Sequence, residues 1–139
     1  MVDPGFTRKA GAGQGYSYQQ TMLRIKDPKP TLEFYQKHFQ MQLVACRHFP
    51  QWKFSLYFLG TFPEGHTFHF EPESDEAFSF LNSFDGTVLE LTHNHGTEED
   101  PEFKHHNGNT DPRGFGHIGF IVDDLVPFCE KLEADGVKF

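Results

Sequence analysis

Residues 20–27, QTMLRIKD, and residues 117–124, HIGFIVDD, share one pattern: a polar first residue, an apolar run and an acidic end. Such a short apolar run is typical of a β-strand. Each segment is followed by apolar residues at i, i+3 and i+7, the spacing of one helix face. These residues are Leu32, Tyr35, Phe39 in the first copy and Leu125, Phe128, Leu132 in the second. We therefore expect an internal strand–helix repeat, and not two unrelated strand–helix pairs.

The first copy continues with three more strand-like segments, MQLVACRHF, KFSLYFLGTF and TVLELTHN, which predicts the order β-α-β-β-β. The intervening residues 63–86 are rich in acidic residues, proline and glycine, and we expect them to be mostly loop. In the second copy a helix and the start of one strand, GVKF, follow. The expected fold is α+β. Its parts are a flexible N-terminal tail at 1–17, a βαβββ module at 18–96, a linker loop at 97–114 and an incomplete second module at 115–139.

The composition limits the classes of function. The net charge of −8 disfavours a nucleic-acid or anionic-membrane surface as partner. No apolar run approaches the roughly 20 residues of a membrane span, and the first 17 residues lack the apolar centre of a signal peptide. Two distant cysteines, Cys46 and Cys129, favour free thiols in a reducing compartment. We expect a soluble, cytoplasmic domain.

Alternation along the strands suggests a site. Side chains two apart share a face, so Gln20 and Arg24 lie together on one strand, and Glu90 and Asn94 on another. His117 begins the strand that repeats the Gln20 strand. A Gln, Glu and His set suits a divalent transition metal, and an arginine beside an asparagine suits a carboxylate. The simpler alternative, that these side chains are only the solvent-facing half of each strand, stays open at this point.

The chain closely resembles the glyoxalase I family of the vicinal-oxygen-chelate superfamily, from about Tyr18 to Phe139. The stretches that carry the resemblance are QQTMLRIKDPKPTLEFY, KFSLYFLG, LELTHNHGTEED and HNGNTDPRGFGHIGF. The resemblance implies paired βαβββ modules, in agreement with the repeat. It also implies that Gln20, Glu90 and His117 are metal ligands, with zinc expected and nickel as the other choice.

The resemblance further implies how a substrate is bound and converted. Arg24, Asn94 and Arg113 match positions that hold glutathione, and three apolar residues match its hydrophobic pocket: Phe49, Leu56 and Phe58. The family's substrate is the hemithioacetal of glutathione and methylglyoxal. The metal stabilises an enediolate, and a glutamate moves a proton between two carbons to give S-lactoylglutathione. A homodimer is also consistent with the family.

Some family features are not matched. The proton-moving glutamate of the family falls beyond Phe139, so we expect this chain to be an incomplete copy, inactive by itself. Gln40 and His95 replace a glycine and a tryptophan of the family pattern. The alternative is a non-catalytic chain that binds a metal or a glutathione conjugate, or regulates the enzyme. The iron dioxygenase branch is disfavoured, because its two-His, one-carboxylate site has no place for Gln20.

Overall fold

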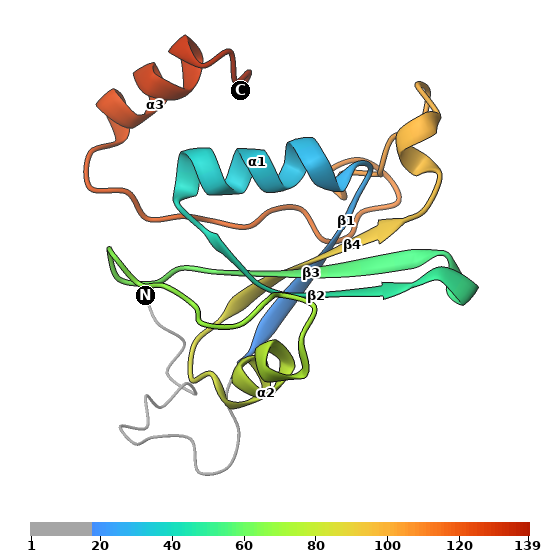
Figure 1. Ribbon diagram of the computed structural model, residues 1–139. Coiled ribbons are helices and arrows are strands. Elements are labelled where there is room, and N and C mark those ends of the chain that lie inside the picture. The colour runs from blue at the N-terminus through green and yellow to red at the C-terminus, as the bar shows by residue number, and fades with distance from the viewer. Residues whose placement is uncertain (1–17) are drawn as a thin grey trace, which may run out of the picture.

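The computed structural model describes residues 18–139, so the tail expected at 1–17 lies outside the described residues. Four strands form one mixed sheet in the order β1-β4-β3-β2 (Figure 1). The central pair β4–β3 is antiparallel, as is β3–β2, whereas the edge strand β1 runs parallel to β4. The strands are β1 (Gln20–Ile25), β2 (Gln42–Phe49), β3 (Phe54–Gly60) and β4 (Val88–Asn94). The predicted strands of the first module are confirmed.

The helix α1 (Pro28–Phe39) covers one face of the sheet (Figure 1). It begins at Asp27, whose side chain accepts a hydrogen bond from the Lys29 amide at 2.9 Å, and proline suits the first turn because its missing N–H is not needed there. It ends at Gln40 in a left-handed conformation, φ 53°. The predicted face of this helix packs on a buried cluster that includes Leu89 and Leu91.

The second helix, α2 (Asp75–Ser83), covers the opposite face of the sheet (Figure 1), and the expectation of loop for this stretch is wrong. Ser74 caps it by accepting a hydrogen bond from the Ala77 amide at 3.2 Å. Asp75 and Glu76 occupy the first turn, where they stabilise the positive end of the helix dipole. Ala77 and Leu81, four residues apart, are buried. This short amphipathic pattern was obscured by the flanking prolines and acidic residues.

Only part of the predicted second copy of the repeat is present in the structure. The helix α3 (Leu125–Ala134) is confirmed, with Asp124 as its N-cap, but residues 117–124 and 136–139 form no strand. A strand exists only where a neighbour accepts its ladder hydrogen bonds, and in the described chain no segment pairs with these residues. Residues 97–114 are irregular apart from the short 3₁₀ helix η2 (Thr97–Glu99). A second such helix, η1 (Pro50–Trp52), joins β2 to β3.

Two apolar clusters make up the core, one on each face of the sheet. The cluster under α1 includes Ile25, Cys46 and Tyr57, and Ile118 packs against it. The cluster under α2 includes Val88 and a group of phenylalanines: Phe58, Phe62, Phe68, Phe70, Phe78, Phe80 and Phe84. Because α2 and these aromatic residues cover only one end of their face, the other end carries the polar residues described next.

Candidate functional site

The candidate site lies on the α2 face of the sheet, where successive rows of side chains cross all four strands. In one row Glu90 of β4 lies between Met22 of β1 and Phe58 of β3. In the next row Thr92 lies between Arg24 and Leu56. The alternation predicted for β1 and β4 is therefore confirmed. Polar groups from distant parts of the chain meet on one surface.

Gln20 and Glu90 form the first polar pair. The Gln20 Nε2 amide donates a hydrogen bond to Glu90 Oε2. The parallel register places Gln20 opposite Val88, so the Gln20 side chain reaches two residues further along β4 to Glu90. These are two of the three residues predicted to bind a metal, and the sheet itself holds them together.

Arg24 and Asn94 form a second pair in the same way. Arg24 lies opposite Thr92, and its side chain reaches two residues further along β4 to Asn94. The Arg24 Nη1 donates to Asn94 Oδ1 at 3.0 Å. Two residues flanking Asn94, on the opposite face, anchor this end of the strand: His93 bonds Glu98 at 2.7 Å and His95 bonds Ser55 Oγ at 2.7 Å. The bond between Arg24 and Asn94 holds the guanidinium at the Thr92–Asn94 end of β4, with nitrogens left to bind a ligand carboxylate.

Glu90 is electrostatically unusual. Partial burial raises the pKa of its carboxyl group, and a hydrogen bond from the Thr92 hydroxyl at 3.4 Å opposes that rise. Thr92 itself is 6% exposed. A carboxylate that is partly withdrawn from water is a better partner for a cation or a proton than an exposed one.

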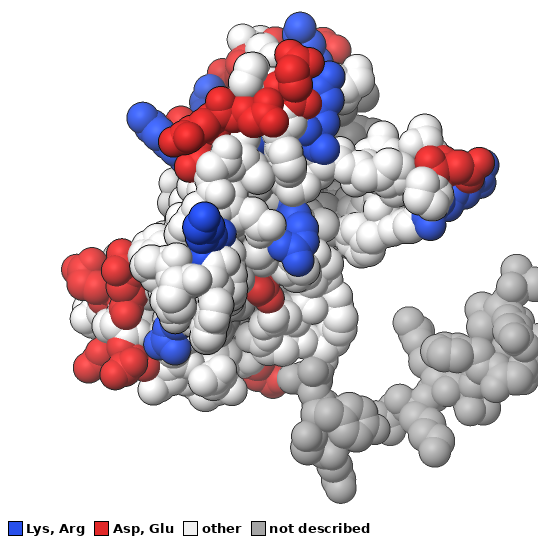
Figure 2. All heavy atoms as spheres, turned by 90° about the vertical axis from the view of Figure 1, so that its right-hand side faces the viewer, with Lys and Arg blue, Asp and Glu red and all other residues white. Residues whose placement is uncertain are grey.

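A cavity of about 410 Å³ joins Glu90 to the pair of Arg24 and Asn94. Arg24, Glu90, Thr92 and Asn94 line it on one side, and Trp52, Lys53, Phe54 and Leu56 on the other. Trp52 and Lys53 were not predicted as site residues. Their signal in the sequence is slight, since it consists only of their place in the β2–β3 connection. Figure 2 shows the side of the molecule where β2 and β4 end: basic side chains appear as separate spots in an uncharged area, with acidic clusters at the margins.

The three predicted pocket residues have different surroundings. Leu56 lines the cavity. Phe49 stacks on Phe54 and Trp52, with ring centroids 4.7 and 5.6 Å apart. Phe58 is 6% exposed and belongs to the core under α2. The open apolar surface beside Glu90 is thus formed by Leu56 and the aromatic residues of the β2–β3 connection.

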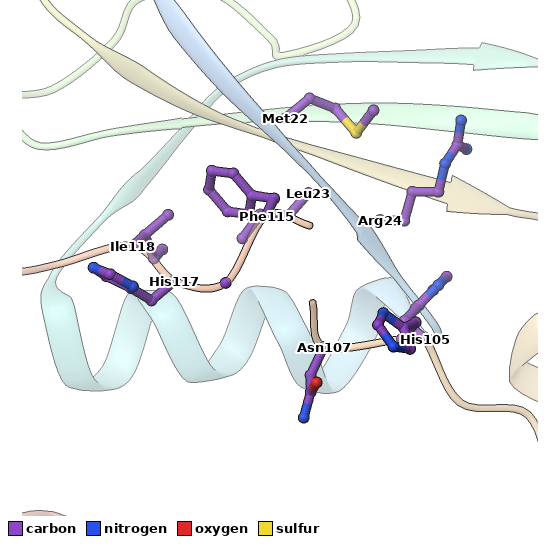
Figure 3. A pocket seen from close by; sticks show the side chains of 10 residues that line it. Met22, Leu23, Arg24, His105, Asn107, Phe115, His117 and Ile118 are labelled. Atoms are coloured by element: carbon purple, nitrogen blue, oxygen red, sulfur yellow. The ribbon is translucent and has the colours of Figure 1, made fainter. Parts of the chain in front are cut away.

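His117 and Arg113 lie apart from this surface. His117 lines a cavity of about 600 Å³ together with Leu23, Phe115 and Ile118, and Met22 and Arg24 of β1 border the same cavity. Figure 3 shows Met22 and Arg24 projecting to one side of β1 and His117 on the other side, toward α1. Arg113 is exposed, and its nearest ionic partner is Asp111 at 3.6 Å. The structure brings together four of the six predicted polar site residues and separates the other two from them.

The residues on the α2 face fit part of a metal site. The Gln20 amide oxygen and the Glu90 carboxylate are suitable donors for a divalent cation, provided that the amide turns its oxygen away from its present bond. A catalytic zinc site commonly uses three protein ligands. Within residues 18–139, no group of three or more His, Cys, Asp or Glu side chains is arranged to hold a metal ion. The α2 face therefore supplies two of the three predicted ligands, Gln20 and Glu90, and the third, His117, lies on the other side of β1 (Figure 3).

Two other observations concern the cysteines and the helices. Both cysteines are free, as predicted. No helix within residues 18–139 combines the length and apolar character needed to cross a membrane.

Comparisons with known proteins place the chain in a family. Residues 17–139 match the model of the Glyoxalase/Bleomycin resistance protein/Dioxygenase superfamily. The chain is 46% identical over 138 residues to a lactoylglutathione lyase of Pseudomonas putida, a match that covers 98% of this chain and 77% of that protein. It is 49% identical over 120 residues to glyoxalase I of Saccharomyces cerevisiae, which covers 86% of this chain and 35% of the yeast protein.

The fold agrees with a solved structure. The trypanothione-dependent glyoxalase I of Leishmania major superposes with a TM-score of 0.61 at 24% identity, covering 88% of this chain and 68% of that one. At this identity the match supports the fold alone. With the family match over nearly the whole chain and close sequence relatives, the conclusion is that the chain belongs to the lactoylglutathione lyase, or glyoxalase I, family of the Glyoxalase/Bleomycin resistance protein/Dioxygenase superfamily.

Proposed function

We propose that this protein is a metal-dependent lactoylglutathione lyase, which isomerises the hemithioacetal of glutathione and methylglyoxal to S-lactoylglutathione. The observation that carries the proposal is the pairing of Gln20 with Glu90 and of Arg24 with Asn94 on one face of the sheet. These pairs place oxygen donors suited to a cation on the same face of the sheet as a guanidinium suited to a carboxylate. The sequence identity to lactoylglutathione lyases supports the same activity.

The roles of the chain's own residues follow from the site. Arg24, held by Asn94, binds a carboxylate of the tripeptide through charge-assisted hydrogen bonds. Leu56 and the stacked rings of the β2–β3 connection receive the apolar part of the conjugate. Glu90 and Gln20 supply two ligands to a divalent metal, for which we propose zinc. When bound, such a cation stabilises negative charge on substrate oxygens.

A third metal ligand is required, and we propose His117 for that role. Its present position on the α1 side of β1 means that residues 115–120 must move, or that a second copy of the chain supplies the histidine. The exposed apolar side chains of this region, among them Phe115 and Ile121, support association into a homodimer. We propose Arg113 as an additional contact for glutathione. Free thiols support a cytoplasmic location.

The deciding experiment is formation of S-lactoylglutathione from methylglyoxal and glutathione by the purified chain with added zinc. The assigned roles require that any turnover by wild type is lost in Gln20→Ala and Glu90→Ala. Leu23→Met, on the other face of β1, is the matched control and should retain the wild-type rate. Turnover that persists in both site variants would refute the assigned roles.

One observation favours a second candidate function. Because His117 lies on the other side of β1 from the face that carries Gln20 and Glu90, the chain would also suit a binding protein for glutathione conjugates with no catalysis of its own. Tight binding of S-methylglutathione with no turnover at any zinc concentration would establish this alternative, whereas turnover would exclude it.

A further inference from the structure

Arg47 is a charged residue on the apolar side of the site, and the proposed function gives it no role. It lies on the edge strand β2, directly opposite Leu56 of β3. Its neighbours in the adjoining rows on β2 are Ala45, opposite Phe58, and Phe49, opposite Phe54. Since side chains two apart share a face, Arg47 points to the same side of the sheet as Leu56 and borders all three residues of the predicted hydrophobic pocket.

The guanidinium is held in a defined position. Its Cζ lies 3.8 Å from the centre of the Phe78 ring, a cation–π contact. The ring of Phe78 in turn meets that of Phe58 edge-on, with centroids 6.0 Å apart. Asp75, at the start of α2, adds an ion pair at 3.6 Å, although its own side chain is fully exposed. The planar stack, more than this exposed ion pair, fixes the arginine.

This position puts a charged group next to Leu56 on its β2 side, beyond the residues that line the 410 Å³ cavity. A ligand that lies on Leu56 beside Glu90 and extends toward β2 meets the side chain of Arg47 over Phe78. The side chain of Arg47 is 42% exposed, so its guanidinium remains partly hydrated. A small substituent stops short of it, whereas a long apolar substituent would have to displace the guanidinium or remove its water, at a cost in binding free energy.

We propose that Arg47 sets the size and polarity of the apolar end of the site, so that the protein selects glutathione conjugates with small substituents over those with bulky apolar ones. The proposal rests on the proposed function, because it assumes that a glutathione conjugate occupies this face. Arg47 acts here as a specificity-determining residue, with no part in the movement of protons.

The test compares binding of S-methylglutathione and S-hexylglutathione to the full chain by isothermal titration calorimetry. In Arg47→Met, which keeps an unbranched side chain without charge, we expect the Kd for S-hexylglutathione to fall about tenfold. The Kd for S-methylglutathione should change less than about twofold. Asp75→Asn is the matched control: it removes the ion pair and leaves the stack on Phe78, so the ratio of the two Kd values should stay near that of wild type.

The outcomes separate this inference from the proposed function. If wild type binds neither conjugate, the proposed function fails and the inference fails with it. If wild type binds both and Arg47→Met leaves the ratio unchanged, only the inference is overturned. Phe78→Leu, which removes the ring under the guanidinium while the charge remains, provides a second measurement. It should shift the ratio in the same direction as Arg47→Met, and an unchanged ratio in this variant counts against the inference as well.

Discussion

The Glu90 carboxylate is partly buried and has no cation beside it. We therefore expect Glu90 to lower the free energy of unfolding at neutral pH. Burial raises its pKa in the folded chain above that in the unfolded chain. Between the two pKa values the folded chain then binds more protons than the unfolded chain. The contribution of Glu90 to the free energy of unfolding therefore falls as pH rises above about 4.3. Above the folded-state pKa the loss is complete.

Glu90→Gln should therefore unfold at a higher urea concentration than wild type at pH 7. The amide retains an oxygen to accept the Gln20 hydrogen bond and removes the charge. The difference between variant and wild type should shrink as pH falls toward 4, because Glu90 then becomes protonated in wild type. Urea titrations from pH 4 to 8 measure it, and a difference that is the same at every pH would contradict the assigned cause. Glu99→Gln, in the exposed turn η2, is a suitable control.

Cys46 and Cys129 should differ in reactivity. Cys46 lies in the core under α1, 4% exposed, and burial together with the nearby Glu73 raises the pKa of its thiol to about 11. At pH 8 about one thiol in a thousand is then ionised, and the thiolate is the reactive form. Cys129 on α3 is only half-buried.

Iodoacetamide at pH 8 should modify Cys129 well before Cys46, as mass spectrometry of the intact chain and its peptides would report. Cys129→Ser should remove the fast modification. In urea, which unfolds the chain, iodoacetamide should modify the two cysteines at similar rates. Faster modification of Cys46 in the folded chain would refute this ranking.

At the scale of the element, α2 depends on its first residues. Ser74 accepts the Ala77 amide hydrogen bond at 3.2 Å, and replacing such a cap by alanine costs about 1 kcal/mol. We expect Ser74→Ala to lower the free energy of unfolding by about that amount in a urea titration. Ser83→Ala, in the last turn of the same helix, should cost less, since its hydroxyl bonds only helix carbonyls. Equal losses in the two variants would argue against the cap.

At the scale of the whole molecule, residues 115–126 and α3 present a row of exposed apolar side chains. Ile121, Leu125 and Val126 are 103, 65 and 64% exposed, and α3 lies beyond α1, on the side away from the sheet (Figure 1). Patches of this kind mark surfaces of association. The helix α3 and its C-cap make few contacts with α1: the rings of Phe128 and Phe39 have centroids 5.7 Å apart, and Asp135 forms an ion pair with Lys37 at 3.0 Å.

We expect the chain to self-associate, with a sedimentation coefficient that rises with protein concentration. The double variant Ile121→Lys and Leu125→Lys should sediment as a monomer over the same range, because the added charges oppose burial of the patch. Lys138→Glu is a charge control outside the patch and should behave as wild type. Association that is unaffected by the double variant would place the contact elsewhere.

The alternation of polar and apolar residues in β1 and β4 determined, from the sequence alone, which side chains share a face, because the strand period is fixed by backbone geometry. It likewise determined α1 and α3 from their helical spacing. The resemblance to a family supplied the metal and glutathione roles of these residues, which no local pattern contains. The helix α2 was missed, since its apolar residues are too few to stand out among prolines and acidic residues.

Only the tertiary structure decided which polar residues meet. The parallel register of β1 and β4 joins Gln20 to Glu90 and Arg24 to Asn94 across 70 positions of sequence, and register is a property of pairing that no single strand encodes. The same is true of His117: its segment has the pattern of a strand, but a strand forms only with a partner for its backbone groups, and here the segment packs Ile118 under α1. Local pattern fixes the face of a side chain, whereas the pairing of strands fixes its neighbours.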